Sequence, residues 1–235
     1  SSSSAASDVY KRQTLTLDLD LQTYVQQKLE KAKANSKASG AEAVVLDAAT
    51  GQVLAMANTD TVDPNKNVED QLDEGKDFEN RSVSHPYEPG SVAKVVTAAA
   101  ALQEGVTTPD EVHQVPGSID MAGVTVNDAW EHGTEPYTTT GIFGKSSNVG
   151  TLMIADKLGQ EKYAEYLKKF GLGNTTGIEL PNESAGSVPD LEQWSGGTFA
   201  NLPIGQGQSW TTLQMASVYQ ALANGGERIE PRIID

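Results

Sequence analysis

Two residues of this chain, Ser91 and Lys94, have the types and the spacing that serine chemistry needs. They occur within EPGSVAK, the only Ser-x-x-Lys in 235 residues. Residues at i and i+3 share one face of a helix, so the Lys94 amine can reach the Ser91 hydroxyl. A neutral lysine is a competent general base for a serine nucleophile. On its own, a Ser-x-x-Lys motif is far more often a serine N-cap followed by a lysine in the first helical turn, and only the rest of the chain favours the catalytic interpretation.

The apolar run after the motif predicts the helix that would position it. The pattern favours a helix from Val92 to Glu104, with Gly105 as its stop. Ser91 would then lie at the helix N-terminus, where free N–H groups and the helix dipole favour developing negative charge. The same positive end, together with surrounding valines, would favour loss of the Lys94 proton.

A second motif, KSSNVG, holds the only Ser-x-Asn of the sequence, Ser146 and Asn148. It precedes an apolar run, Val149 to Ala155, that predicts a helix ending near Gly159. A hydroxyl and a carboxamide two residues apart offer a proton relay and an amide that can hold a substrate backbone. By itself, this pair is more often a capped turn than a catalytic element.

Together the two motifs resemble those of the penicillin-recognising serine transferases and hydrolases. Further segments resemble one branch, the class B penicillin-binding proteins, and the stretch from Val115 to Thr151 is most similar to the septal, cell-division type. The similarity covers about residues 14–235. Besides the motifs, it is carried by GAEAVVLDAATGQVLAMAN, KFGLGNTTGIELPNESAG and NLPIGQG…LQMASVYQALANGG.

The resemblance implies an α/β fold of the penicillin-binding-protein/β-lactamase type, with an antiparallel sheet and an all-helical lobe. It implies that Ser91 is the acylated nucleophile and Lys94 its base. Ser146 would relay a proton toward the leaving amine, and Asn148 would bind the donor peptide. For Gly205, Gln206 and Gly207 two interpretations stay open, substrate contact or, as favoured here, a backbone support beneath the site.

The implied reaction is peptidoglycan D,D-transpeptidation. A stem peptide ending in D-Ala-D-Ala would acylate Ser91 and lose its last residue, and the amine of a neighbouring stem peptide would then resolve the acyl-enzyme. β-Lactam antibiotics would trap the first step. The resemblance also implies partners among divisome membrane proteins and a glycosyltransferase. It places the enzyme on the extracytoplasmic face of the bacterial membrane, held by an N-terminal anchor.

The family's third motif, Lys-Thr/Ser-Gly, does not occur in the sequence. We therefore expect a transpeptidase domain that is partial at its C-terminus and weakly active or inactive as it stands. Residues 1–13 contain SSAASDVYKRQ, which matches one reading frame of a transposon sequencing adaptor, and we exclude them from the fold. We expect residues 14–40 to form a linker strand and helix, and residues 41–235 to form the transpeptidase domain.

Three alternative functions remain at this level. A class A β-lactamase would share Ser-x-x-Lys, but its Glu-x-x-x-Asn pattern is absent. A class D β-lactamase or a penicillin-sensing domain usually has Ser-x-Val where this chain has Asn148. A non-catalytic divisome interaction fragment is the third. Whether Ser91 becomes acylated separates the third alternative from the enzymes.

The composition excludes several classes of partner, covalent chemistry and cofactor. The formal net charge of −15 argues against nucleic acid and anionic lipid as partners. The absence of cysteine excludes disulfides and thiol catalysis. The histidines, His85, His113 and His132, lack ligand spacing, so we interpret them as surface residues and expect no metal and no other cofactor.

A coarse pattern of elements accompanies these motifs. Thr14 to Leu19 alternates like a strand, and Asp20 is expected to cap a helix over Leu21 to Ala34. A β-hairpin is expected over 41–57, and an irregular acidic loop over 58–84. The region from 91 to 170 is expected to be mostly helical with two long loops, and Thr211 to Ala223 a further helix.

Overall fold

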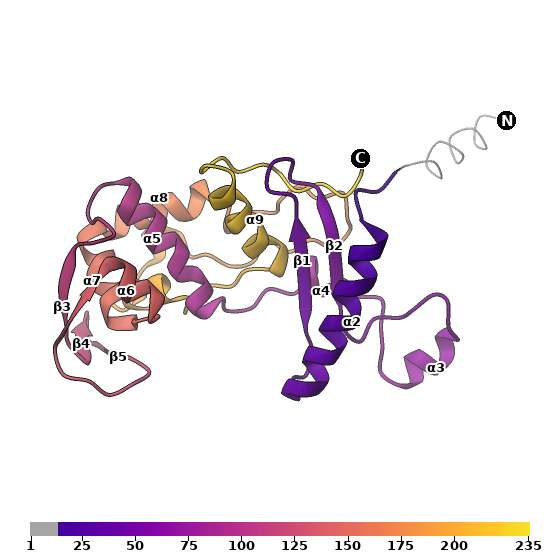
Figure 1. Ribbon diagram of the computed structural model, residues 1–235, viewed down its shortest axis with the longest axis horizontal. Helices are drawn as coiled ribbons and strands as arrows, with labels where there is room; N and C mark the ends of the chain where they lie inside the picture. Colours follow the sequence, from indigo (N-terminus) through magenta and orange to yellow (C-terminus); the bar gives the residue numbers. More distant parts are fainter. Residues whose placement is uncertain (1–13) are drawn as a thin grey trace. The chain divides into compact units, whose positions relative to one another are not determined.

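The structure, a computed structural model, describes residues 14–235, and the adaptor-like segment 1–13 lies outside the described residues (Figure 1). The chain divides into two compact units. The first comprises the described part of residues 1–86 together with residues 174–185 and 211–235, and the second comprises residues 87–173 and 186–210. No helix within residues 14–235 is both long enough and apolar enough to cross a membrane.

The first unit is built on a β-hairpin, as the sequence predicts. Its two strands pair antiparallel from Glu42 opposite Asn58 to Val45 opposite Ala55, with an irregularity before Leu46. The elements of this unit are α2 (Leu19–Ser36), β1 (Glu42–Leu46), β2 (Val53–Asn58), α3 (Val68–Asp73), α4 (Arg81–Ser84) and α9 (Thr212–Ala223).

Helix α9 begins where the sequence predicts, because Thr211 and Gln214 form a reciprocal capping box. The helix packs against the hairpin, and one apolar cluster joins it to β2, α4 and the C-terminal segment. The buried members of that cluster are Val53, Met56, Val83, Ile178, Leu213 and Ile233.

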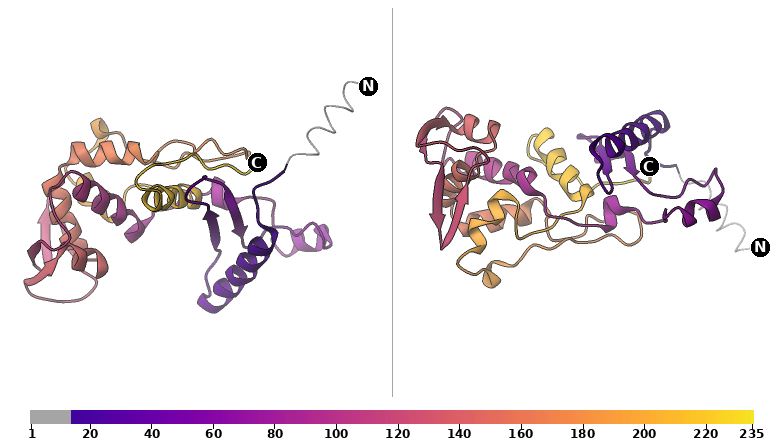
Figure 2. Two further views of the ribbon diagram at one scale, coloured as in Figure 1. Left: turned by 45° about the horizontal axis from the view of Figure 1, so that its top comes forward. Right: turned by 90° about the horizontal axis from the view of Figure 1, so that it is seen from below.

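Helix α2 lies along the outer edge of β2, and the two run side by side in Figures 1 and 2. The Gln22 side chain donates to Met56 O at 2.8 Å and accepts from Met56 N at 2.7 Å. Gln26 donates to Asn58 O at 2.9 Å. Glutamine side chains therefore satisfy backbone groups of β2 that would otherwise form an exposed sheet edge.

The start of α2 differs from the prediction. The cap is Asp18, whose side chain accepts from Leu21 N at 3.0 Å, and the helix begins at Leu19. The prediction of Asp20 as the cap is wrong, because Asp18 comes first and its extended backbone places the carboxylate over the first turn. The predicted strand over Thr14 to Leu19 is reduced to a single bridge between Leu15 and Ile234.

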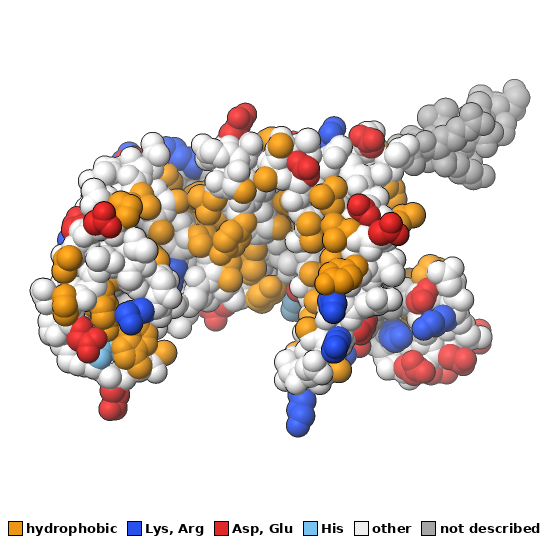
Figure 3. Space-filling view, in the orientation of Figure 1, with side chains coloured by type: hydrophobic (Ala, Val, Ile, Leu, Met, Phe, Trp, Pro, Cys, Tyr) orange, Lys and Arg blue, Asp and Glu red, His pale blue; other side chains and the backbone are white. Residues whose placement is uncertain are grey.

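The acidic segment before residue 84 is more ordered than predicted, since it contains α3 and α4. Asn67 caps α3 by accepting from Asp70 N. The buried member of α3 is Gln71, whose side chain bonds both the N–H and the carbonyl of Asp63. A polar side chain holds α3 in place, and the surface of the helix is charged (Figure 3). The sequence of α3 therefore lacks the apolar periodicity by which a helix is predicted.

The second unit carries both sequence motifs on short helices. Its elements are η1 (Gly90–Ala93), α5 (Lys94–Gln103), β3 (Val112–Val115), β4 (Ser118–Met121), β5 (Val124–Asn127), β6 (Glu135–Thr138), α6 (Thr139–Gly144), α7 (Asn148–Leu158), α8 (Gln160–Lys169), η2 (Leu191–Gln193), η3 (Thr198–Ala200) and η4 (Leu202–Ile204).

The two long loops expected in this unit contain strands. Strand β3 pairs antiparallel with β6, and β4 pairs antiparallel with β5, giving two small sheets beside the helices. Helix α7 is buried along much of its length. Helix α6 packs tightly on it because Gly150 has no side chain, and Ile142 of α6 fills the space that one would need. A Cβ at Gly150 would lie 2.7 Å from Ile142 Cγ1.

Two of the three histidines are not surface residues, contrary to the prediction. His113 is a member of β3, is 4% exposed and lies 2.8 Å from Thr139 Oγ1. The His132 side chain is 2% exposed and lies against Asp128. Both imidazoles are buried because hydrogen-bonding partners accompany them, which a single sequence does not reveal.

Candidate active site

Ser91 and Lys94 lie at the start of the first long helix of the second unit. Ser91 is in η1, and Lys94 is the first residue of α5. The predicted helix is therefore present, but its first turn is a tighter 3₁₀ turn, in which Lys94 N bonds Ser91 O. Ser91 is exposed to solvent, whereas Lys94 is 4% exposed.

The Ser-x-Asn motif joins α6 to α7 and supplies the group that links Ser91 to Lys94. Ser146 Oγ donates to Ser91 Oγ at 3.0 Å. Lys94 Nζ donates to Ser146 Oγ at 2.9 Å and to Ser146 O at 2.8 Å. The structure thus brings together three predicted site residues from two segments 55 positions apart.

Backbone geometry holds these groups in place. Ser146 has a left-handed backbone with φ of 57°, which is uncommon for a residue other than glycine. Asn148 begins α7, and its Nδ2 donates to Asn127 O at 3.2 Å at the end of β5. Asn148 therefore lies within two residues of Ser146, as the motif requires, but its amide group is directed to β5 in this state.

The surroundings of Lys94 favour the neutral amine that a general base needs. Burial lowers the pKa of Lys94 to about 8, because the charged ammonium loses water. The negative charge of Asp128 acts in the opposite direction and raises that pKa. An amine with this pKa is neutral in an appreciable fraction of molecules near neutral pH, so it can accept a proton.

The segment from Gly205 to Gly207 supports the backbone just before the serine. Gly205 has φ of 85°, and its carbonyl accepts from Gly90 N at 3.1 Å. A Cβ on Gly205 would lie 1.8 Å from Gly90 O. Gly207 N donates to Glu88 Oε2 at 2.7 Å, and Gln206 is exposed. These contacts favour the support interpretation, and substrate contact stays a prediction.

Gly205→Ala is expected to displace Gly90 and the adjoining Ser91, because the new methyl group would overlap a backbone atom. We expect a lower melting temperature and at least about a tenfold slower reaction of Ser91 with penicillin, since small misplacements of reacting groups cost large rate factors. Gly105→Ala is the matched control, since Gly105 shares a positive φ of 69° but has open space around it. Equal effects of the two variants would contradict the close-approach argument.

Asp128 and His132 lie next to the site and were not among the predicted residues. The Asp128 carboxylate contacts Ser147 and Val149 of the motif loop, and His132 Nε2 lies 2.7 Å from Asp128 Oδ2. The only sequence signal is an aspartate that directly follows an alternating strand pattern, Val124 to Asn127. That signal is too common to single out a residue without the fold.

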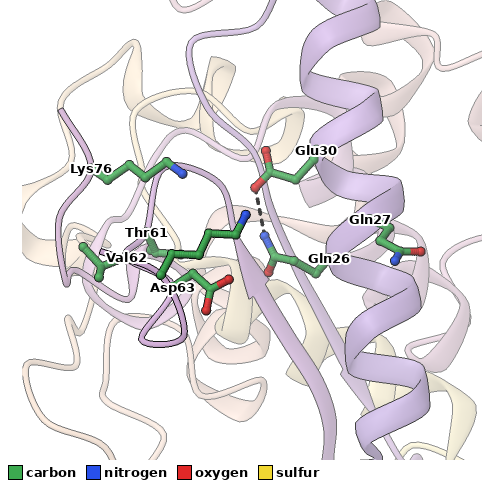
Figure 4. A pocket seen from close by; sticks show the side chains of 8 residues that line it. Gln26, Gln27, Glu30, Thr61, Val62, Asp63 and Lys76 are labelled. Atoms are coloured by element: carbon green, nitrogen blue, oxygen red, sulfur yellow. Dashed lines mark hydrogen bonds between the residues drawn. The ribbon is translucent and has the colours of Figure 1, made fainter. Parts of the chain in front are cut away.

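A concavity in the first unit differs in kind from the Ser91 site. It is a cavity of about 560 Å³ between α2 and the segment from residue 61 to 76 (Figure 4). Gln26 and Glu30 bond one another on its α2 wall, and charges of both signs line it. Its lining side chains provide no nucleophile paired with a base. Among residues 14–235, moreover, no group of three or more His, Cys, Asp or Glu is arranged to hold a metal ion.

Comparisons with known proteins identify the family to which the chain belongs. The penicillin binding protein transpeptidase domain family matches residues 41–235. Penicillin-binding protein PbpB of Mycobacterium tuberculosis is 61% identical over 94% of this chain and 32% of that protein. Peptidoglycan D,D-transpeptidase FtsI of Escherichia coli is 34% identical over 90% of this chain and 35% of that protein. The chain thus spans about a third of the length of these relatives.

Solved structures give the same result. The crystal structure of penicillin binding protein 3 from M. tuberculosis complexed with aztreonam matches with a TM-score of 0.91 at 61% identity, covering 94% of this chain and 49% of that one. A structure of a peptidoglycan synthetase from Bifidobacterium adolescentis matches with a TM-score of 0.86 at 33% identity, over 94% of this chain and 40% of that one.

A fold of this kind, with a serine joined through a second hydroxyl to a buried amine, is typical of the serine enzymes that react with penicillin. Within that class, the chain belongs to the penicillin binding protein transpeptidase domain family. The predicted family and fold class are confirmed, with the addition that the helical unit also contains two small antiparallel sheets.

Proposed function

We propose that the chain is part of a peptidoglycan D,D-transpeptidase that cross-links stem peptides through an acyl-serine intermediate. The observation that carries the proposal is the chain of hydrogen bonds from Lys94 Nζ through Ser146 Oγ to Ser91 Oγ. The similarity to E. coli FtsI, which is named a peptidoglycan D,D-transpeptidase, supports the same activity.

In the acylation step, Ser91 Oγ attacks the carbonyl carbon of the penultimate D-Ala of a stem peptide. The serine proton passes to the neutral amine of Lys94, for which Ser146 Oγ is placed as the bridge. The Ser91 N–H, in the first turn of the helix, stabilises the oxyanion that forms. The peptide C–N bond then breaks, and the leaving D-Ala takes the proton from Lys94 through the Ser146 hydroxyl.

In the second step, an amine of a neighbouring stem peptide attacks the ester carbonyl. Lys94 accepts the proton of that amine, the ester bond to Ser91 breaks, and the hydroxyl regains its proton. The Asn148 amide hydrogen-bonds the backbone of the donor peptide, which requires it to exchange its contact with Asn127 O for the substrate. A β-lactam acylates Ser91 in the same way but retains its leaving group.

The similarity to relatives also supports a cellular role and location for the protein. Similarity to PbpB and FtsI supports a role in septal cell-wall synthesis at the extracytoplasmic face of the membrane. Divisome membrane proteins and a glycosyltransferase are the partners that such a role needs. The structures of a relative with aztreonam and with ampicillin support β-lactams as ligands of this chain.

The test uses the full-length product of the gene, incubated with benzylpenicillin and digested for mass spectrometry. We expect one penicilloyl adduct on the peptide that contains Ser91, and release of D-Ala from a synthetic donor ending in D-Ala-D-Ala. An adduct on another residue, or no adduct in a folded protein, would refute the proposed function.

A further inference from the structure

The Asp128 carboxylate is a buried anchor for the loop that carries the Ser-x-Asn motif. Its side chain is fully buried at the end of β5. Ser147 Oγ donates to both carboxylate oxygens, at 3.0 and 2.9 Å, and Val149 N donates to Oδ1 at 3.0 Å. The carboxylate that directly follows β5 therefore binds the residues on either side of Asn148.

His132 completes this anchor through both of its ring nitrogens. Its Nε2 lies 2.7 Å from Asp128 Oδ2, and its Nδ1 lies 2.6 Å from the carbonyl oxygen of Gly133. A carbonyl oxygen only accepts, so Nδ1 carries a proton, and the carboxylate already accepts from Ser147 and Val149, so Nε2 donates to it as well. Hydrogen bonding to Asp128 accordingly raises the pKa of His132.

The ring of His132 is fixed by its neighbours. It stacks on Trp130 with 5.3 Å between ring centroids and packs against Tyr137 of β6. The charged groups that face this cluster besides Asp128 are Glu135, which bonds the Tyr137 hydroxyl, and Lys145, whose Nζ lies 5.4 Å from the centre of the Tyr137 ring. The pair is thus held between β5, β6 and the motif loop.

We propose that the Asp128–His132 ion pair is the positioning element of the motif loop, and that it holds the Ser146 hydroxyl against Ser91. Ser146 directly precedes Ser147, and its left-handed backbone persists because the residues after it are anchored. Ser147 also caps α7 by accepting from Gly150 N. The side chain of Ser147 thus ties the motif loop to the end of β5. It thereby fixes the position of the Ser146 hydroxyl, which bridges Ser91 and Lys94.

The pair also has an electrostatic effect on the base. The Asp128 charge raises the pKa of Lys94, whereas a protonated His132 offsets that charge. Removing the carboxylate should lower the pKa of Lys94, because its ammonium form loses an attraction. Removing the imidazolium while leaving the carboxylate should raise it. The two changes therefore act in opposite directions, which a general loss of order would not produce.

The inference rests on the proposed function, and its test uses the full-length gene product and benzylpenicillin. In Asp128→Asn, we expect acylation of Ser91 to slow by about 10–100-fold, because the bridge is misplaced. The melting temperature should also fall, because the buried His132 loses its charged partner. His132→Gln keeps the carboxylate and an amide donor, so we expect a smaller loss. Asp120→Asn, an exposed acid on neighbouring β4, is the matched control and should acylate as fast as the parent.

Two further readouts separate positioning from simple stability. The pH at which acylation reaches half of its maximum should fall in Asp128→Asn and rise in His132→Gln, relative to the parent. In ¹⁵N NMR spectra at pH 7, both ring nitrogens of His132 should be protonated in the parent, and one should lose its proton in Asp128→Asn. These signals report on the pair directly.

Several results would overturn the proposal. If Asp128→Asn acylates within about twofold of the parent, the pair does not position the loop. If the pH profiles of Asp128→Asn and His132→Gln shift in the same direction, or if neither variant folds, the Asp128–His132 pair has a purely structural role. A parent protein that forms no adduct would refute the proposed function, and the ¹⁵N spectra would still decide whether the ion pair exists.

Discussion

Ser91→Ala is expected to abolish covalent labelling of the full-length gene product by fluorescent penicillin. The reason is chemical, because no oxygen remains at the position from which Lys94 and Ser146 remove a proton. Ser146 Oγ lies only 3.0 Å from the lost atom, but it occupies the bridging position and has its own contact with the lysine. The measurement is the intensity of the labelled band after denaturing electrophoresis, relative to the total protein.

The control for this result is a serine elsewhere in the same unit. Ser118 is exposed on β4, and Ser118→Ala should label like the parent. Both variants should keep the parent's melting temperature, since each removes a single exposed hydroxyl. Labelling of Ser91→Ala at the parent's level would show that another residue is the nucleophile.

The rate of acylation is expected to rise with pH until Lys94 is largely neutral. The amine must be unprotonated to accept the serine proton, and burial lowers the pKa of Lys94 to about 8. Below that pKa the rate should increase about tenfold per pH unit, and it should level off above about pH 9. The acylation rate falls in acid because acid protonates Lys94, and a protonated amine cannot accept the serine proton. Stopped-flow measurement of penicillin acylation between pH 6 and 10 gives the profile.

Lys94→Arg tests the same base by substitution. Arginine stays protonated throughout this range, so we expect acylation to fall by about 10²–10⁴-fold, the usual contribution of a general base, and the pH dependence to disappear. Lys162→Arg, which changes an exposed ion-paired lysine of α8, should leave the profile unchanged. A parent profile that still rises steeply up to pH 10 would mean that Lys94 keeps an ordinary pKa.

The central part of the site could be predicted because its residues are close in sequence within each motif. Ser91 and Lys94 are three positions apart, so helix geometry alone places them together. Ser146 joins them only through the fold, and the resemblance to a known family supplied that step. The helices α5, α7 and α9 were predictable because each combines an apolar run with a clear cap or a glycine stop.

The parts that were missed depend on contacts between segments that are distant in sequence or lack an apolar pattern. Helix α3 is held by Gln71 and a cap, so hydrophobic periodicity could not reveal it. Asp18 and Asp20 both suit a helix start, and only the backbone conformation decides between them. The burial of His113 and His132 follows from partners such as Thr139 and Asp128, which the fold places beside them.

The left-handed backbone of Ser146 has a consequence for how this protein could evolve or be engineered. An L-residue in that conformation is less stable by about 1 kcal/mol than it would be in an ordinary one, whereas glycine adopts it freely. Ser146→Gly would therefore relax the backbone and remove the bridging hydroxyl in the same change. On the proposed mechanism, selection for stability alone would favour an inactive enzyme at this position, so a screen for thermostable variants should include a labelling step.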